Sequence, residues 1–221
     1  MLCRQARGRV RVEKTRVAGV RVLCAYVSRD KQLARAARLL RRAGVRRILE
    51  SVGWRPELPG LPVVDALPLY RAAADRLVLE QLDVRGIAPE RASVVLRGAC
   101  PDGELTAAAY ALCPQVRQVI VDTERGGEEL QRSLLRRFGA AVLPVKDGRD
   151  VLAVRFSGTY AGEELSLCGQ GGLGGLSLDV PQLVLPEELV RASVLCALWQ
   201  AGVLDLSQVQ VCRTEAENKF T

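Results

Sequence analysis

Strand-like and helix-like segments alternate along most of this chain, and the alternation constrains its fold more than any other feature. The segment 93–98 (SVVLRG) is apolar and β-branched, which is typical of a buried strand. A helix is predicted at 101–113, a second strand at 116–122 and a second helix at 126–139. Strands joined by single helices lie parallel, because the helix carries the chain back. We therefore expect an α/β fold whose mostly parallel sheet has helices on both faces.

The rest of the chain follows the same alternation less regularly. A buried strand is predicted at 20–27 (VRVLCAYV), and Asp30 is the expected cap of a helix that ends at Ala43, with Gly44 as its stop. The remaining predicted elements are short strands at 45–50 and 63–66, a helix near 68–83, strands at 140–145 and 150–156, and a closing helix from Pro186 to near Gly202.

Composition excludes several kinds of chemistry. Histidine is absent, which removes Ser-His-Asp and Cys-His catalysis and histidine-ligated zinc. Seven scattered cysteines without a C-x-x-C pair indicate reduced thiols and a cytoplasmic location. No long uncharged apolar run occurs, so we expect no membrane span. The loop carboxylates follow no metal-ligand pattern, so we expect no metal site. Whether the chain is an enzyme is left open, since no catalytic residue can be named.

The stretch CGQGGLGGLSLD, residues 168–179, contains the spacing G-x-G-x-x-G at Gly169, Gly171 and Gly174. A dinucleotide loop needs a helix that opens at these glycines. The residues that follow are strand-like, and Pro181 would interrupt a helix. The motif therefore favours a loop or wide turn between strands.

A better position for a ligand lies in SVVLRGACPDGELTAAAYALCPQVRQVIVD, where strand, turn, helix and strand end at Asp122. This arrangement resembles the cofactor half of Rossmann-type dehydrogenases, including shikimate and alanine dehydrogenases, over residues 92–145. The resemblance implies NAD or NADP as cofactor, with Gly98 and Gly103 in the phosphate loop and Asp122 at the ribose hydroxyls.

The turn departs from the dehydrogenase pattern, because RGACPDG replaces G-x-G-x-x-G and carries Asp102 and Glu104 into the first helical turn. These carboxylates oppose an incoming pyrophosphate. We therefore expect a Rossmann-like protein that binds a small ligand or a protein partner without the standard phosphate loop. The residues expected to line its pocket are Arg97, Gly98, Gly103, Asp122, Gly126 and Gly127.

A second hypothesis keeps the cofactor. In it the chain is an NAD(P)-dependent oxidoreductase with an atypical cofactor turn. Such an enzyme would need a proton donor, for which Lys31, Lys146 and Tyr70 are the candidates.

A turn-rich stretch near 85–91 separates the two sets of elements. We accordingly expect two α/β lobes between short terminal segments. The expected parts are a basic N-terminal segment (1–17), an N-terminal α/β lobe (18–90), a C-terminal Rossmann-like lobe (91–212) and a polar tail (213–221).

Charge is concentrated at the start of the chain. Residues 1–50 carry 15 Lys and Arg against 3 Asp and Glu, whereas the rest carries 17 against 22. At helical spacing, one face of the first helix presents Lys31, Arg35, Arg38 and Arg42. This anion-binding face supports a third hypothesis, a nucleic-acid-associated protein. The alternative is a solvated helix face in an arginine-rich chain.

Overall fold

The computed structural model describes residues 2–4, 8–54, 57–139, 150–159, 162–169 and 172–214. The chain forms two compact units, and each unit is built from two stretches of sequence. The N-terminal unit comprises Met1–Ala66 and Asp179–Gln210, and the C-terminal unit comprises Leu67–Leu178 and Val211–Thr221.

The C-terminal unit contains a sheet of four parallel strands. In the order β5-β4-β6-β7, these are β5 (Gln118–Thr123), β4 (Ser93–Gly98), β6 (Val151–Arg155) and β7 (Leu165–Ser166). Counted along the chain this order is 2-1-3-4, one of the two common orders of doubly wound sheets. The chain passes from β4 to β5 on one side of β4 and then to β6 on the other side, so the topological switch point lies between β4 and β6. The predicted α/β class with a Rossmann-like parallel sheet is confirmed.

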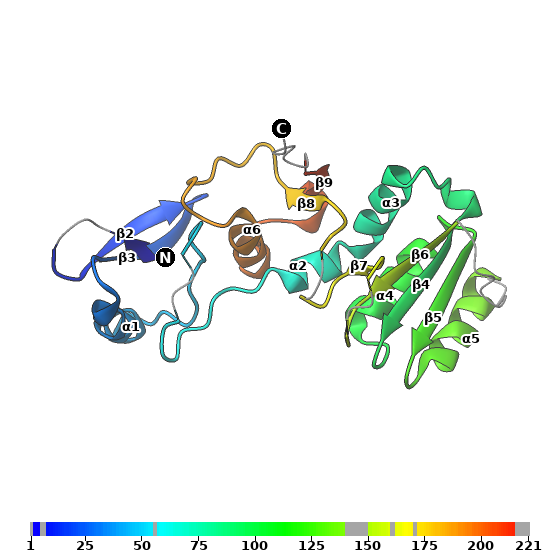
Figure 1. The fold of residues 1–221 in the computed structure, drawn as a ribbon, viewed down its shortest axis with the longest axis horizontal. Helices are drawn as coiled ribbons and strands as arrows, with labels where there is room; N and C mark the ends of the chain where they lie inside the picture. Colours follow the sequence, from blue (N-terminus) through cyan, green and yellow to red (C-terminus); the bar gives the residue numbers. More distant parts are fainter. Residues whose placement is uncertain are drawn as a thin grey trace. The chain divides into compact units, whose positions relative to one another are not determined.

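Helices flank this sheet (Figure 1). Three of them pack against one another, α3 also contacts β6 and α4 also contacts β5, while α5 runs beside β5. Asp102 caps α4 by accepting a hydrogen bond from the backbone N–H of Leu105 at 2.8 Å, as its sequence position favours. The bounds of the four helices are α2 (Leu67–Ala72), α3 (Ala74–Val84), α4 (Gly103–Leu112) and α5 (Gly127–Phe138).

One face of β4 and β6 is apolar. Val94 and Leu96 of β4 are register partners of Leu152 and Val154 of β6, and all four are completely buried. Paired residues on parallel strands point to the same side, so these side chains form one continuous layer of the core. The alternate residues of the same strands point to the opposite face, where the charged groups of the unit gather.

A glutamine side chain covers the free edge of strand β5. Gln131 of α5 donates from Nε2 to the carbonyl of Val119 at 3.1 Å and accepts from the N–H of Val121 at 3.0 Å. The amide thus makes the two hydrogen bonds that a further strand would make with β5. Gln131 is buried, so the bonds are shielded from water.

The N-terminal unit contains a smaller sheet of three strands in the order β1-β3-β2. Strands β2 and β3 are antiparallel and are joined by Ala18 and Gly19, which both have positive φ, as a two-residue hairpin turn requires. Strand β1 lies parallel to β3 on its other side. The strands are β1 (Leu2–Arg4), β2 (Arg11–Val17) and β3 (Val20–Val27).

Helix α1 covers this sheet with Ala36, Ala37 and Leu40, which are buried against Ala25 and Val27 of β3. The remaining elements include a two-stranded sheet of β8 and β9. Their bounds are η1 (Asp30–Gln32), α1 (Leu33–Arg42), η2 (Pro89–Arg91), β8 (Leu176–Asp179), α6 (Arg191–Gln200), η3 (Leu206–Gln208) and β9 (Gln210–Arg213).

Several expected elements differ in the structure. The strands predicted at 45–50 and 63–66 are reduced to one bridge between Ile48 and Val63, because neither segment finds a longer partner. Asp30 opens a 3-10 turn and does not cap α1. The last helix begins at Arg191 and not at Pro186. The strand predicted at 140–145 lies outside the described residues.

Candidate functional site

Charged side chains meet at the carboxyl ends of three neighbouring strands in the C-terminal unit. Arg97 of β4 is the register partner of both Asp122 on β5 and Arg155 on β6. The three side chains therefore form a row on the face opposite the apolar layer. This edge is where open α/β sheets bind their ligands.

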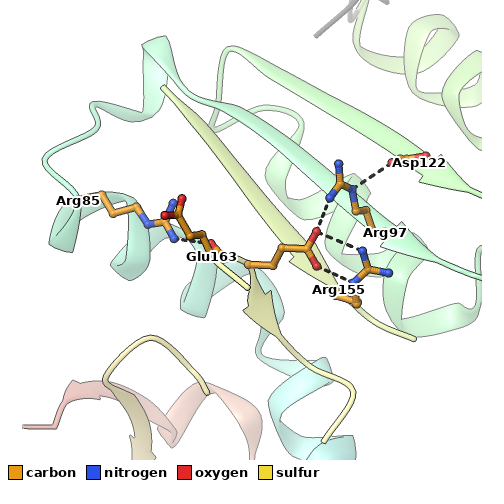
Figure 2. Close-up of polar contacts among 6 residues, drawn as sticks. Arg85, Arg97, Asp122, Arg155 and Glu163 are labelled. Carbon is orange, nitrogen blue, oxygen red and sulfur yellow. Dashed lines mark hydrogen bonds and ion pairs between the residues drawn. The ribbon is translucent and has the colours of Figure 1, made fainter. Parts of the chain in front are cut away.

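Glu164, which precedes β7, joins the row into one ion-pair cluster. Arg97 donates from Nε to Asp122 Oδ2 at 3.0 Å and pairs through Nη1 with Glu164 Oε1. Arg155 grips the same carboxylate with two donors, Nε to Oε2 at 2.5 Å and Nη2 to Oε1 at 3.1 Å. Figure 2 shows Arg97 between Asp122 and Arg155, with both guanidinium groups directed at one carboxylate.

The cluster passes from a buried to an exposed end. The side chains of Glu164 and Arg155 are 6% and 17% exposed, whereas those of Arg97 and Asp122 are 36% and 59% exposed. The hydrogen bond from Arg155 lowers the pKa of Glu164, against burial, which raises it, and Arg97 lowers it further. Arg155 and Glu164 therefore form a buried ion pair that supports the accessible Arg97–Asp122 pair through the contact between Glu164 and Arg97.

A third arginine fills the space beside the start of α4. Arg71 of α2 donates from Nε to the carbonyl of Leu167 at 2.9 Å and from Nη2 to the carbonyl of Phe156. Its Nη1 lies 3.3 Å from Glu104 and 4.0 Å from Asp102. Arg71 thus neutralises the two carboxylates that the sequence places in the first turn of α4. It also satisfies carbonyl groups just beyond the ends of β6 and β7.

The loops at this edge are packed closely together. Ser157 Oγ accepts a hydrogen bond from the N–H of Ala99 at 2.8 Å, and a Cβ added to Gly98 would lie 3.1 Å from the same oxygen. A Cβ on Gly127 would lie 2.6 Å from Thr123 Oγ1. These two glycines therefore serve loop packing.

The structure brings Arg97 and Asp122 into contact, as expected of one site. Gly98 is joined to the loop after β5, since its carbonyl accepts from the N–H of Glu124 at 3.3 Å. Gly126 lies against Pro101, from which an added Cβ would stand 3.2 Å away, and Gly103 is the first residue of α4. That these residues line one ligand pocket stays a prediction.

The anion-binding face predicted on the first helix belongs to the N-terminal unit. It consists of Lys31 in η1 and Arg35, Arg38 and Arg42 in α1, and all four are exposed. Within the described part of the chain, none of the four forms an ion pair or side-chain hydrogen bond. We name this set the basic face of α1.

The G-x-G-x-x-G stretch is a loop between β7 and β8, as predicted, and no helix opens at the glycines that the structure describes. Gly171 lies outside those residues. Gly174 has φ +63°, and a Cβ there would lie 2.5 Å from Oε1 of the buried Gln81. The final glycine of the motif thus packs against the Gln81 side chain of α3.

Three residues of this region were missed by sequence reasoning: Arg71, Arg155 and Glu164. Aligning the two strands SVVLRG and VLAVRF at their first residues would have placed Arg97 opposite Arg155. Two adjacent guanidinium groups need an anion between them, which would have pointed to an acid.

Of the three proposed proton donors, two lie among the described residues. Tyr70 is on α2 and Lys31 is in η1 of the N-terminal unit, while Lys146 lies outside the described residues. Of the other loop carboxylates, Asp150 pairs with Arg91 at 2.9 Å at the opposite, amino edge of the sheet. The Arg91–Asp150 pair is a natural control for Arg97–Asp122.

Comparison with known proteins gives no relative: no protein-family model matches the sequence, and no curated protein matches it. Among the described helices, none is both long and apolar enough to cross a membrane.

Proposed function

We propose that the C-terminal unit binds a small polar ligand at the carboxyl ends of β4 and β5, with Arg97 and Asp122 as its contact residues. One observation carries this role. The Arg97–Asp122 pair is the solvent-accessible end of a cluster whose other end is buried and fixed. Groups held in place before binding lose little freedom when a ligand arrives, which favours affinity.

The free hydrogen-bonding capacity of the pair defines the ligand. A guanidinium carries five N–H donors, and Arg97 uses Nε on Asp122 and Nη1 on Glu164. The Nη2 group is left for a carboxylate or phosphate oxygen, with which arginine makes strong charge-assisted bonds. Asp122 is an acceptor for a hydroxyl. The favoured ligand is therefore a small anion that also carries a hydroxyl group.

A dinucleotide is the alternative ligand that the resemblance to dehydrogenases implies. Asp102, Glu104 and Arg71 occupy the start of α4, where a standard phosphate loop would present free N–H groups. If a dinucleotide binds in spite of these side chains, the chain is an oxidoreductase with an atypical cofactor turn. NAD and NADP belong among the test compounds for this reason.

The test is a thermal-shift screen of the purified chain against NAD, NADP, ATP and S-adenosylmethionine, and against glycerate as a small hydroxylated anion. A ligand that binds the native state raises Tm. We expect a rise that is abolished in Asp122→Asn and retained in Asp150→Asn, the matched change at the amino edge. An equal response of the two variants, or no rise with any compound, would overturn the proposal.

A second function is favoured by the basic face of α1, and we propose that it contacts the phosphates of a nucleic acid. Its four cations span residues 31–42, which are eleven steps of about 1.5 Å, or about 16 Å in all. The buried apolar residues of α1, which are Ala36, Ala37 and Leu40, lie in the core of the N-terminal unit and not on the basic face, which therefore offers no anchor for insertion into a bilayer. Cations without carboxylate partners are available to phosphates.

Fluorescence anisotropy with labelled single-stranded and duplex oligonucleotides over a series of salt concentrations tests this second function. Each lost phosphate contact reduces the salt slope by about one, so Arg35→Gln/Arg38→Gln should reduce it by about two. The control is Arg132→Gln/Arg136→Gln, which removes two exposed arginines from α5. Absence of binding at low salt, or equal effects of the two double variants, would exclude the function.

A further inference from the structure

Two cysteines of the N-terminal unit lie in contact across neighbouring strands. The sulfur atoms of Cys3 on β1 and Cys24 on β3 are 3.1 Å apart. Cys3 is the register partner of Tyr26, and Cys24 lies two residues earlier on the same face of β3. A disulfide has sulfur atoms about 2.05 Å apart, so bond formation brings the two sulfur atoms closer by about 1 Å.

We propose that Cys3 and Cys24 form an oxidation site that closes to a reversible disulfide between β1 and β3. The two thiols differ in access, since Cys24 is completely buried and Cys3 is partly exposed. An oxidant in solution therefore reaches Cys3 first. Cys24, already in contact, is the resolving thiol.

The oxidant is a low-molecular-weight disulfide, for which glutathione disulfide is the probe. Cys3 passes its proton to Cys24 along their hydrogen bond and attacks one sulfur of the probe as the thiolate, so the probe's disulfide bond breaks and one glutathione thiolate leaves. The Cys24 thiolate then attacks the Cys3 sulfur of the mixed disulfide and displaces the second glutathione thiolate. Two protein thiols are oxidised, one glutathione disulfide is reduced to two glutathione molecules, and the two protein protons pass to them.

Proton sharing within the pair supports this reactivity. The hydrogen bond from the Cys3 thiol lowers the pKa of Cys24 to about 6, although burial opposes the shift. The same hydrogen bond raises the pKa of Cys3. The pair therefore holds one thiolate and one proton at neutral pH. Because the thiolate is the reactive form, the lowered pKa of Cys24 favours its attack on the mixed disulfide at Cys3.

The cross-link would hold a short strand. Strand β1 has three residues, Leu2–Arg4, and joins the sheet only through β3. A bond from Cys3 to Cys24 closes a loop that contains β2 and the hairpin turn, and it restricts the unfolded chain. Oxidation should therefore raise Tm, and dithiothreitol should reverse the rise.

The experiment treats the full chain with glutathione disulfide and then counts free thiols by alkylation in denaturant and intact mass. The wild type should lose two of its seven thiols without gaining a glutathione adduct, and peptide mapping should recover a Cys3–Cys24 cross-link. Cys100→Ser, which removes an exposed cysteine, should also lose two thiols. Cys3→Ser should lose none.

Three outcomes would overturn the proposal. The wild type would keep all seven thiols, or Cys3→Ser would lose as many as the wild type, or Cys3 would stop at the glutathione adduct. Circular dichroism of Cys3→Ser before treatment shows whether the variant is folded. If it is not, the cross-link map of Cys100→Ser decides the matter alone.

Discussion

Arg97 on β4 and Arg155 on β6 are register partners on neighbouring parallel strands, and one carboxylate, that of Glu164, accepts from both. Without that anion the two guanidinium groups would repel each other across the sheet. The exposed Arg97–Asp122 pair therefore depends on a buried residue from the segment that leads into β7.

Removing this anion should destabilise the C-terminal unit. Breaking a buried pair leaves an uncompensated charge, at a cost of about 3–5 kcal/mol, so Glu164→Gln should lower the free energy of unfolding by about 3 kcal/mol. Urea unfolding measures the change. Glu163→Gln is the control, because Glu163 is exposed and contacts Arg85 only through its backbone carbonyl. Equal losses in the two variants would contradict the central position of Glu164.

The same carboxylate should give stability an acid dependence. Arg155 holds the pKa of Glu164 below its value in the unfolded chain. The folded state thus binds fewer protons than the unfolded state in acid, and stability rises with pH there. The contribution is complete above the unfolded pKa, about 4.3, and is lost as pH falls through the folded pKa. Between pH 5 and pH 3, the wild type should lose stability more steeply than Glu164→Gln. Parallel curves would refute this.

Alanine substitutions at two adjacent glycines of the 168–179 loop should distinguish the cost of backbone strain from the cost of a packing clash. Gly174 and Gly175 both have positive φ, but only a Cβ on Gly174 meets a neighbour, Gln81. An alanine in this conformation costs about 1–2 kcal/mol at either position. Overpacking should add about 1–3 kcal/mol to Gly174→Ala alone. Thermal denaturation of the two variants compares them, and equal losses would show that the contact is relieved freely.

The side chain that closes the edge of β5 should be important for stability. Gln131→Leu keeps the volume but leaves the N–H of Val121 and the carbonyl of Val119 without partners, at about 1–3 kcal/mol each. We expect faster amide exchange at Val121 and a loss of about 2–6 kcal/mol in unfolding free energy. Gln115→Leu removes an exposed amide that donates to the carbonyl of Ala111 at the end of α4, and it should change neither quantity. Unchanged exchange at Val121 would show that water replaces the amide.

The parallel sheet could be predicted because its signals are local. The segment 93–98 is β4 residue for residue, and Asp102 caps α4 as its position before the helix favours. The arrangement of parallel strands then placed Arg97 and Asp122 at one edge, since both occupy the carboxyl ends of their strands.

Features that depend on distant partners could not be predicted in the same way. The segment 45–50 has the composition of a strand, but strand formation needs a paired neighbour, and only Ile48 finds one. Glu164 is 67 residues from Arg97 in sequence, so their contact exists only once β6 and β7 are in register. Local composition cannot encode either outcome.

The chain leaves the N-terminal unit at Ala66 and returns to it at Asp179. Helix α6, which buries Val194, Leu195 and Leu198, therefore belongs to the unit that opens the sequence. During synthesis, β4 to β7 have all been made before the first residue of α6 is added. The unit that opens this sequence therefore receives its last helix only after all four strands of the other unit's parallel sheet have been made.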